Sequence, residues 1–466
     1  MSEGMQKILT TPLNRFWKKI DQFVWLILLI CSPLFLFMQS HQSWLLLILP
    51  ILWIISAIAR ERVFPITPLN GILLLLVFQM LISLYATYDI NVSLPKISSL
   101  LFSIALFFAL VKFSYVKKSI LVTVLFFGVA GIGMAILGFL GTSWATAKIS
   151  AFNPIYALLP SLSRLLPGLS AGFHPNEVAG ALVWVLPLWV IASGWLILRA
   201  KFIHSNLKWL LHLFLILLGL VSTLLISVVV FLTQSRSAYL GVLFSLVLII
   251  FFVLPRIWRW VFLVIVIVGV VLVVSFDAVP IFFSWLGNIF PASNLSINAF
   301  SFDTLNGRTK IWSRALIALQ DFSFTGMGMN TFRYLVHQLY PLSPAIPNVV
   351  PKDLGHAHNE ILQSGLDLGI PGMIAFLALN LSAVWMAVTT ILQLQKRSRR
   401  TLNHQELWMR EFFRIITIGL LAGFIGHFIY ALTDAISLGA KPGFIFWILL
   451  SLITSIYMKS KRREFN

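Results

Sequence analysis

The sequence contains few of the residues on which a soluble protein depends. Only 11% of its 466 residues are charged, whereas 59% are hydrophobic, and its single cysteine, Cys31, stands inside an apolar run. A soluble domain could not bury so much apolar surface, and a lone cysteine excludes a disulfide framework. Internal repeats and low-complexity linkers are missing too, so residues 1–466 are expected to form a single membrane domain.

Acidic residues are much scarcer than basic ones. The chain has 15 Asp and Glu against 34 Lys and Arg, which gives a formal net charge of +19. This excess could indicate a nucleic-acid partner, but the basic residues form short clusters between apolar runs instead of one patch. Such clusters are typical of integral membrane proteins, in which they set the orientation. We therefore expect membrane lipids, and no nucleic acid, as partners.

Long apolar runs are what the sequence does have. They lack the alternation of a β-strand and are roughly 17 to 25 residues long, the length with which a helix crosses a bilayer. The sequence therefore predicts an all-α polytopic membrane protein with about twelve transmembrane helices. The predicted spans are 22–38, 43–59, 70–87, 97–114, 119–141, 176–198, 208–232, 238–254, 260–276, 361–394, 412–433 and 441–458.

The basic clusters fall in every second connection between these spans. Because positive residues favour the cytoplasmic side, both termini are expected in the cytoplasm, and the first span is expected to be an uncleaved signal anchor. The clusters are Lys7, Arg15, Lys18 and Lys19; Arg60 and Arg62; Lys112, Lys117 and Lys118; Arg199, Lys201 and Lys208; Arg256 and Arg259; Lys396, Arg397, Arg399, Arg400, Arg410 and Arg414; and Lys459, Lys461, Arg462 and Arg463.

The outer side then carries two large connections, 142–175 and 277–360. The second is an inserted extracytoplasmic loop between spans nine and ten, and it contains an amphipathic stretch from Gly307 to Gln320. We expect this stretch to be a helix that lies on the outer membrane surface or caps a cavity. Its apolar side is formed by Ile311, Trp312, Ala315, Leu316 and Leu319.

Two arginines on the outer side are candidates for binding an anion. Arg236 stands in a very short connection between two spans, against the usual distribution of positive charge. A snorkelling arginine would explain this position, but ionisable residues at membrane depth usually serve a function. Arg308 opens the amphipathic helix, where its guanidinium and the helix N-terminus favour phosphate oxygens. Lys310 and Arg314 would add to that positive field, unless they form a solvated basic face.

Two histidines precede the span at 361–394. His356 and His358 stand in the segment Gly355-His356-Ala357-His358-Asn359-Glu360, and a histidine can act as a general base near neutral pH. With Asp353 and Glu360 the pair would also permit a metal site, but the ligand spacing is loose and we predict none. Interfacial histidines without chemistry are the simpler alternative. Two arginines and a histidine on one membrane face suggest a lipid substrate that bears a diphosphate.

Four segments resemble the O-antigen ligase and polymerase superfamily of bacterial envelope glycosyltransferases. His358-Asn359, nine residues and then Gly369-Ile370-Pro371-Gly372 match the family's pattern in residue type and spacing, and the resemblance covers an O-antigen ligase-like core at about residues 170–375. The other three segments are Ser235-Arg236-Ser237-Ala238-Tyr239-Leu240-Gly241, then Gly307-Arg308 to Trp312 followed by Gly326-Met327-Gly328, and Phe173-His174-Pro175-Asn176-Glu177, in which His-Pro-Asn replaces the more usual Asn-Pro-Asn.

The resemblance implies a multi-pass enzyme of the bacterial inner (plasma) membrane with a GT-C-like helical fold. It would transfer a glycan from an undecaprenyl-diphosphate-linked donor to an acceptor hydroxyl at the periplasmic or extracellular face, with inversion and without metal or cofactor. His358 would be the base, Arg236 and Arg308 would bind the diphosphate, and Asn176 and His356 would support them. Gly369 and Gly372 would allow close helix packing.

Several alternatives stay open at this point. The acceptor could be the lipid A core, a growing chain or a protein, and ligases and polymerases share these motifs. His427 and Asp434 resemble a His…Asp pattern in a cyanobacterial branch of the superfamily linked to inorganic carbon, but helix packing and an end cap would explain them equally well. A secondary transporter for an anion such as bicarbonate, or for a lipid-linked sugar, is the main alternative function, although the middle of each span is almost free of charge.

Overall fold

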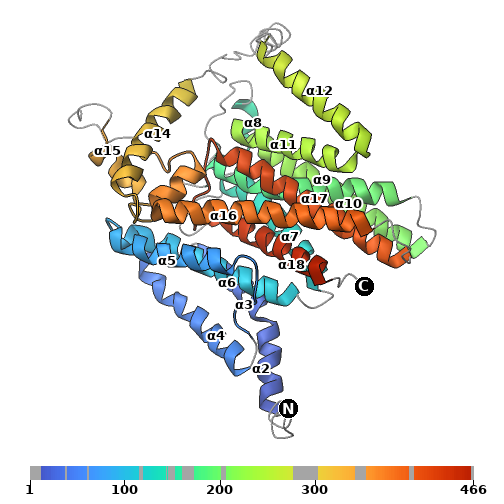
Figure 1. The fold of residues 1–466 in the computed structure, drawn as a ribbon, viewed down its shortest axis with the longest axis horizontal. Coiled ribbons are helices and arrows are strands. Elements are labelled where there is room, and N and C mark those ends of the chain that lie inside the picture. Colours follow the sequence, from blue (N-terminus) through green and yellow to red (C-terminus); the bar gives the residue numbers. More distant parts are fainter. Residues whose placement is uncertain are drawn as a thin grey trace. The chain divides into compact units, whose positions relative to one another are not determined.

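The structure is a computed structural model in which the described residues are helical, with no strand among them (Figure 1). These residues are 12–36, 39–59, 62–114, 119–142, 144, 153–159, 173–200, 206–275, 303–341, 353–397 and 404–462. The all-α polytopic membrane fold is thereby confirmed. Most of the connection 142–175 and much of 277–360 lie outside the described residues, as do both termini.

A helix occupies each of the twelve predicted spans. They are α3 (Val24–Leu36), η1 with α4 (Ser40–Leu47, Ile48–Ile58), α5 (Asn70–Ala86), α6 (Ile90–Ser114), α7 (Ser119–Gly141), α9 (Pro175–Arg199), α10 (Asn206–Leu232), α11 (Arg236–Val253), α12 (Arg256–Ser275), α16 (Glu360–Arg397), α17 (His404–Ala431) and α18 (Phe444–Arg462). The other described elements are α2 (Pro12–Gln22), α8 (Asn153–Ala157), α14 (Asp303–Asp321), α15 (Phe332–Leu339) and η6 (Lys441–Gly443).

Length and hydropathy separate these helices into three groups. Among the described residues, nine are long and apolar enough to cross a membrane, including the continuous helix Ser40–Ile58. The helix α5 is apolar but has 17 residues, and α3 has only 13. The helix α12 occupies the predicted span at 260–276 but is not among the nine. Apolar side chains of these helices that face outward, such as Leu74 and Leu224, are what a lipid environment would cover.

The long helix α16 is interrupted near its N-terminus. Gly369 has φ 71° and ψ 177°, so the helix changes direction there, two residues before Pro371. The amide of Ile370 donates to the carbonyl of Ser323 at 2.7 Å, which replaces a bond lost from the helix. A Cβ at Gly369 would collide with the carbonyl of Phe324, so only glycine fits this close approach.

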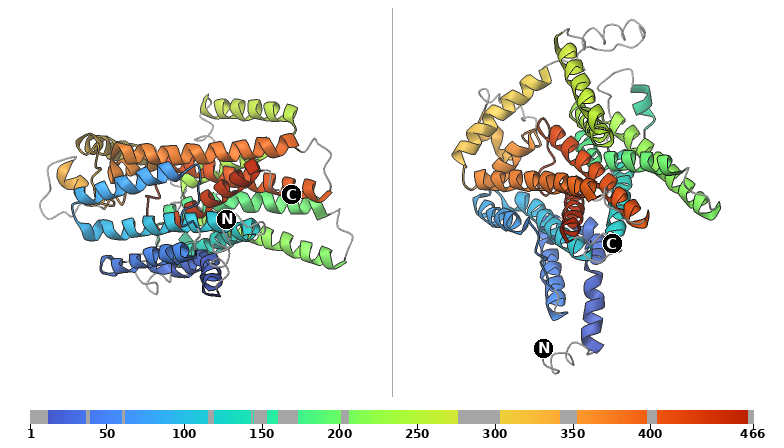
Figure 2. Two further views of the ribbon diagram at one scale, coloured as in Figure 1. Left: turned by 60° about the horizontal axis from the view of Figure 1, so that its bottom comes forward. Right: turned by 45° about the vertical axis from the view of Figure 1, so that its right-hand side comes forward.

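The described helices fall into two compact units, which we treat separately. Unit 1 contains residues 1–131, 310–421 and 431–466, and unit 2 contains residues 132–309 and 422–430. In unit 1, α5 packs against α16, while α6 packs against α3 and α18 (Figure 2). Phe102, Phe107 and Trp447 are buried between these helices, which makes α6 and α18 the centre of the unit.

Unit 2 is held together by small residues at helix crossings. The helix α9 packs against α10 and α11, and a Cβ at Gly241 would meet the backbone of Gly426. Ser245 donates to the carbonyl of Ala422 at 2.8 Å, as expected where backbones approach closely in a membrane. The segment 422–430 of α17 therefore belongs to this unit.

Candidate functional site

Two histidines and an aspartate form a close cluster in unit 1. His356 and His358 precede α16, and Asp434 follows α17. The Nε2 atom of His356 lies 3.5 Å, and the Nδ1 atom of His358 lies 3.4 Å, from the same carboxylate oxygen of Asp434. The side chain of Asp434 is fully buried, whereas that of His358 is 22% exposed. A buried carboxylate needs partners to offset its lost hydration, and these two imidazoles are placed to supply them.

The backbone around His358 is held in an unusual conformation. His358 has φ 50°, a left-handed geometry that costs about 1–3 kcal/mol in a residue other than glycine. Its amide donates to Nδ1 of His356 at 3.0 Å, and the side-chain amide of Asn359 donates to the carbonyl of Leu432 at 3.0 Å. The side-chain oxygen of Asn359 also accepts the amide of Leu362, which caps α16. The His-Asn pair thus fixes the direction of both imidazoles and ties them to the chain before Asp434.

These contacts set the tautomers of the two imidazoles. Because Nδ1 of His356 accepts a hydrogen bond, its proton is carried by Nε2, which faces Asp434. In His358 it is Nδ1 that faces Asp434, and this atom is buried without a hydrogen-bond partner among the described residues. A slight approach of the carboxylate would complete that bond, leaving Nε2 of His358 able to accept a proton.

The same cluster has the composition of a metal site. His356, His358 and Asp434 each offer one ligand atom, and these atoms lie within 4.8 Å of one another. Imidazole nitrogens and a carboxylate oxygen are ligands that zinc accepts, with a fourth position left for water or substrate. In the sequence, Asp353 and Glu360 are the neighbouring candidates for a metal site with the histidines, and their loose spacing predicts no metal. The described geometry offers Asp434 in their place.

Asp353 is instead engaged by a neighbouring arginine. Arg333 of α15 forms a two-pronged ion pair with its carboxylate, and the amide of Gly355 donates to it at 2.8 Å. Partial burial would raise the pKa of Asp353, but the Arg333 guanidinium and the Gly355 amide together hold the pKa below its usual range. This pair anchors the turn that leads into the histidines.

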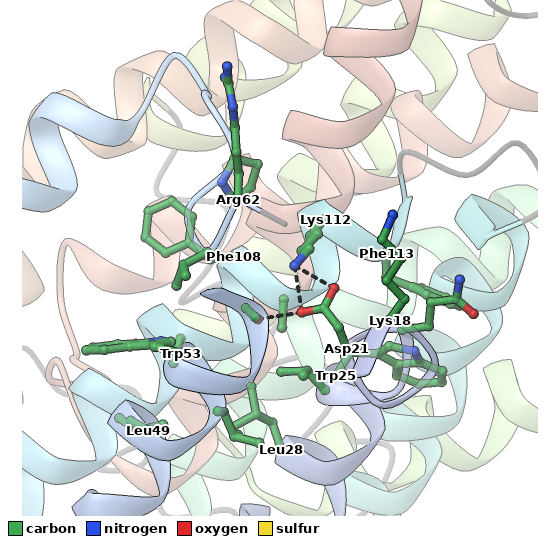
Figure 3. Close-up of a pocket in the computed structure, with 18 of the residues that line it drawn as sticks. Lys18, Asp21, Trp25, Leu28, Leu49, Trp53, Arg62, Phe108, Lys112 and Phe113 are labelled. Atoms are coloured by element: carbon green, nitrogen blue, oxygen red, sulfur yellow. Dashed lines mark hydrogen bonds and ion pairs between the residues drawn. The ribbon is translucent and has the colours of Figure 1, made fainter. Parts of the chain in front are cut away.

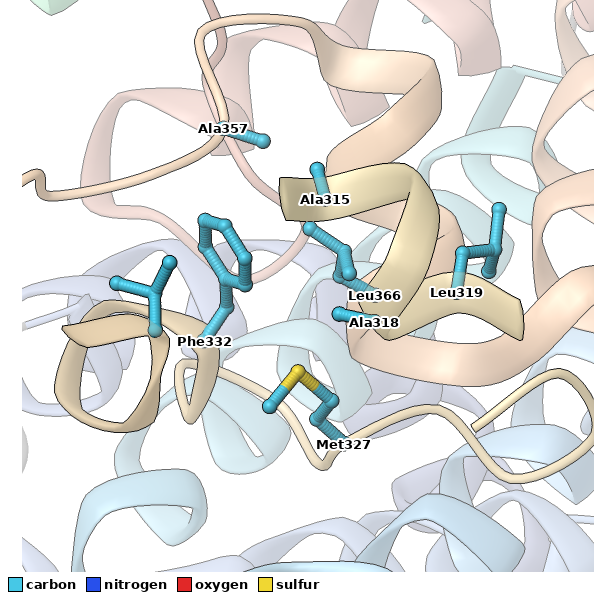
Figure 4. Close-up of a cluster of buried hydrophobic side chains, with 8 residues drawn as sticks. Ala315, Ala318, Leu319, Met327, Phe332, Ala357 and Leu366 are labelled. Atoms are coloured by element: carbon cyan, nitrogen blue, oxygen red, sulfur yellow. The ribbon is translucent and has the colours of Figure 1, made fainter. Parts of the chain in front are cut away.

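The amphipathic helix α14 supports the histidine segment from one side. Ala315, Ala318 and Leu319 pack into a buried cluster with Met327, Phe332, Val336, Ala357 and Leu366 (Figure 4). Trp312 donates its indole N–H to the carbonyl of Ala357 at 3.0 Å, directly between the two histidines in sequence. Part of the apolar side of α14 therefore contacts protein, while Leu316 is 50% exposed.

Two of the predicted substrate-binding residues on α14 differ in their surroundings. Lys310 is exposed, whereas Arg314 is only 4% exposed and donates to the carbonyl of Tyr340 at 3.3 Å. Burial lowers the pKa of Arg314. The hydroxyl of Tyr340 in turn donates to Asp321 at 2.7 Å, and burial together with this bond raises the pKa of Tyr340 to about 12. Arg314 thus joins the two described helices of the loop, α14 and α15.

The buried residue Asp367, which was not predicted as a site residue, holds the glycine-rich segment 326–330 that follows α14. Asp367 of α16 is fully buried, accepts the amide of Asn330 at 3.1 Å and accepts the side chain of Gln363 at 2.9 Å. The amide of Met327 donates to the carbonyl of Leu366 at 2.7 Å. A charged side chain at the outer end of a predicted span was the available signal, because such residues rarely lack a structural or functional role.

Unit 2 brings two other predicted residues together. Arg236 is the first residue of α11, Arg308 lies in the first turns of α14, and both are half-buried. Their guanidinium groups are close enough for the two positive charges to repel each other. The turn before α11 is tightly built, since Gln234 has φ 48° and Thr233, Gln234 and Ser235 are all buried.

Aromatic hydroxyls surround this turn. Tyr239 donates to the carbonyl of Phe231 at 2.6 Å, and Tyr156 of α8 donates to the carbonyl of Leu232. Burial raises the pKa of Tyr156 to about 12, so this hydroxyl stays neutral. Tyr239 stands in the predicted motif around Arg236 but was assigned no role there, and Tyr156 was not predicted from the sequence.

Asn176 and His427 both belong to unit 2. Asn176 is half-buried at the start of α9, and its backbone carbonyl accepts the hydroxyl of Tyr430 at 3.0 Å. His427 is buried, stacks on Trp184 with ring centroids 3.7 Å apart and contacts the carbonyl of Gly180 through Nδ1 at 2.9 Å. These contacts are those of a side chain packed between helices, which is one of the two alternatives that the sequence left open for His427.

One family model matches a part of the chain that contains several of these residues. Residues 221–377 match the family model described as O-antigen ligase. These residues are similar to an O-antigen ligase domain. The resemblance drawn from the motifs is thereby confirmed for this part of the chain, and it supports a membrane glycan ligase or polymerase, a family of enzymes. No curated protein matches the chain.

The O-antigen ligase domain contains most of the predicted site. Arg236, Arg308, His356 and His358 lie inside the matched residues, whereas Asn176 and Asp434 lie outside them. The partner of His358 is therefore supplied by the helical segment that follows the domain. Within each unit the structure brings one pair of predicted residues together, the histidines in unit 1 and the arginines in unit 2.

Proposed function

We propose that the protein is an inverting, metal-independent glycosyltransferase that moves a glycan from an undecaprenyl-diphosphate-linked donor to an acceptor hydroxyl. Such an enzyme is an O-antigen ligase or a polysaccharide polymerase, and its acceptor is a lipid-borne core, a growing chain or a protein. The single observation that carries the proposal is the contact between Nδ1 of His358 and the buried carboxylate of Asp434.

The assigned base is His358. Asp434 holds the imidazole with Nδ1 toward the carboxylate and stabilises the imidazolium that forms when Nε2 takes a proton. His356 shares the carboxylate and holds the backbone of His358 through Nδ1, so we assign it a positioning role. The strained φ of His358 fits this assignment, because backbone strain persists where the surrounding contacts over-determine a site.

The assigned diphosphate ligands are Arg236 and Arg308. Two half-buried guanidinium groups that repel each other are stabilised when an anion lies between them. Planar guanidinium forks also match phosphate oxygens in pairs, which a lysine cannot do. Lys310 is assigned to the surrounding positive field, and Asn176 to the support of this anion site, with Arg314 joining α14 to α15.

The reaction follows from these roles as a direct displacement. The acceptor oxygen attacks the anomeric carbon on the face opposite the diphosphate, a new C–O bond forms, and the bond to the diphosphate oxygen breaks. The hydroxyl proton passes to Nε2 of His358, and the negative charge that develops on the leaving diphosphate is stabilised by the arginines. One displacement at the anomeric carbon inverts its configuration.

The proposed location is the bacterial plasma membrane, with both termini in the cytoplasm and the reaction at the outer face. The alternation of basic clusters along the sequence supports this orientation. It gives His358, Arg236 and Arg308 access to a donor whose glycan lies on the outer side and whose lipid remains in the bilayer.

A transfer assay with purified protein in lipid tests the proposal. The assay supplies an undecaprenyl-diphosphate glycan with a panel of lipid, glycan and peptide acceptors, and product is detected by mass spectrometry. We expect transfer by the wild type, loss of transfer in His358→Ala, and full transfer in His41→Ala, a matched variant of an exposed histidine. Wild-type transfer that survives in folded His358→Ala would remove the assigned base.

A further inference from the structure

A deep cavity opens in unit 1 between α2, α3, α4 and α6. It has a volume of about 800 Å³, a size that accommodates a ligand or part of a lipid (Figure 3). Three cationic residues that line the cavity lie at or just beyond helix ends. Lys112 lies in the last turn of α6, Arg462 is the last residue of α18, and Arg62 follows α4. In Figure 3 the side chains of Lys112 and Asp21 point toward each other among the lining residues.

The lining of this cavity is strongly basic. Four cationic side chains line it, Lys18, Arg62, Lys112 and Arg462, together with one acidic side chain, Asp21. Asp21 is buried, pairs with Lys112 at 2.7 Å and accepts the hydroxyl of Ser56. Cationic side chains thus outnumber acidic ones among the residues that line the cavity.

The walls of the cavity are apolar and aromatic. Trp25, Trp53, Leu28, Leu49 and Phe108 line it beside the basic groups. Tryptophan next to lysine and arginine is typical of the level at which headgroups meet acyl chains. A free inorganic ion would use only the basic part of such a lining, whereas a lipid would use both parts.

The cavity lies at the opposite end of unit 1 from the histidine cluster. The first residues of α6 contact the segments near that cluster, since Ser93 donates to the carbonyl of Met329 at 2.6 Å and Lys96 donates to Ser437. Lys112 lies near the other end of the same helix, on the order of 25 Å away at 1.5 Å per residue. The cavity is therefore separate from the proposed transferase site.

We infer that this cavity is a binding site for an anionic phospholipid. The phosphate would bind the cationic side chains of the lining, to which Arg62 and Lys18 belong, and the first part of an acyl chain would lie along Trp53 and Leu49. The basic connections of a membrane protein account for cations at these helix ends, but they do not account for a hollow with apolar walls beside them. Basic pockets between transmembrane helices are a known form of lipid-headgroup site. The inference stands apart from the transferase proposal, because no residue is shared.

Native mass spectrometry of the delipidated full-length protein tests the inference. We would titrate phosphatidylglycerol against phosphatidylcholine for the wild type, for Lys18→Gln/Arg62→Gln, and for Lys19→Gln as the matched control. Lys19 is exposed on the same helix but does not line the cavity. We expect the double variant to bind the first phosphatidylglycerol at least tenfold more weakly, and the control to bind it like the wild type. Equal binding by all three proteins would overturn the inference.

A second measurement covers the case in which the double variant does not fold. Wild-type protein carrying one phosphatidylglycerol is titrated with inorganic phosphate at constant ionic strength. Retention of the lipid supports a site for an amphiphile, whereas displacement at millimolar phosphate would show that the site recognises the free ion and would overturn the assignment to lipid. Equal affinity of the wild type for phosphatidylglycerol and phosphatidylcholine would also overturn it.

Discussion

The Nδ1 atom of His358 lies 3.4 Å from a carboxylate oxygen of Asp434, a side chain that is fully buried and that also faces His356. A buried carboxylate beside an imidazole orients the ring and favours its protonated form during proton transfer. The pair joins the segment before α16 to the segment after α17, so its geometry depends on how these two helices pack.

Replacing Asp434 by Asn should keep the shape of the site but remove the charge. We expect kcat for glycan transfer to fall about 10²- to 10⁴-fold with little change in KM for the donor, because general-base catalysis contributes a factor of this size. Asp353→Asn is the matched control, since Asp353 pairs with Arg333 instead of a histidine. A kcat that falls equally in both variants would contradict the assigned role of Asp434.

The sequence predicts the two histidines and the two arginines but not the partner of His358. His358-Asn359 and the glycines that follow form a local pattern with fixed spacing, and Arg236 is conspicuous because it breaks the distribution of positive charge. Asp434 belongs to a pattern with His427, but that pattern does not pair it with His358. It reaches His358 only through the packing of helices that are distant in sequence, and neither hydrophobicity nor spacing encodes that packing.

The helical fold could be predicted from the sequence because its signal is also local. Apolar runs of the length of a membrane span determine helices almost by themselves, because an unpaired backbone is too costly in lipid. The kink at Gly369 was different: a Gly-x-Pro-Gly sequence permits a break, but the need for one comes from the carbonyl of Phe324, which approaches from another segment. The residues around Gly369 in the sequence do not reveal such a contact with a distant segment.

Arg308→Lys tests whether donor binding depends on the planar guanidinium group or only on the positive charge. We expect donor affinity to fall about tenfold or more, because lysine keeps the positive charge but cannot form a planar pair of hydrogen bonds. The measurement is the KM or Kd for the undecaprenyl-diphosphate donor, with Arg256→Lys as a control from an exposed position of the same unit. Donor affinity that is unchanged in both Arg308→Lys and Arg236→Lys would remove the diphosphate assignment.

Arg314→Met should act mainly on stability. The methionine keeps most of the apolar contact of the buried stem but loses the hydrogen bond to the carbonyl of Tyr340. We expect a loss of about 1–3 kcal/mol in the stability of the loop, seen as a lower Tm in detergent and faster proteolysis between α14 and α15. Wild-type Tm combined with weaker donor binding would show instead that Arg314 contacts the substrate.

Gly369→Ala should distort the break in α16. A methyl group there meets the carbonyl of Phe324, and the residue must also keep φ at 71°, so we expect a destabilisation of about 1–3 kcal/mol or more. Gly71→Ala is the control, because its Cβ would have open space within a helix and alanine favours helices. The check is the thermal unfolding of both variants, and an equal Tm would contradict the proposed constraint at Gly369.

Removal of metal decides between the two chemistries that the histidine cluster permits. If His358 is a base oriented by Asp434, treating the purified protein with EDTA and 1,10-phenanthroline should leave kcat unchanged. The substitution His356→Gln should then reduce kcat only in part, because His356 serves to position His358. If the three side chains instead hold an ion, the chelators should abolish transfer, and added Zn²⁺ should restore it. In that case His356→Gln should be as inactive as His358→Ala, because each substitution would remove one of the three ligands that the described residues offer. The described geometry favours the first outcome in one respect: because Nδ1 of His356 accepts the amide of His358, the proton of this ring is on Nε2, the atom that would have to be unprotonated to hold an ion beside Asp434.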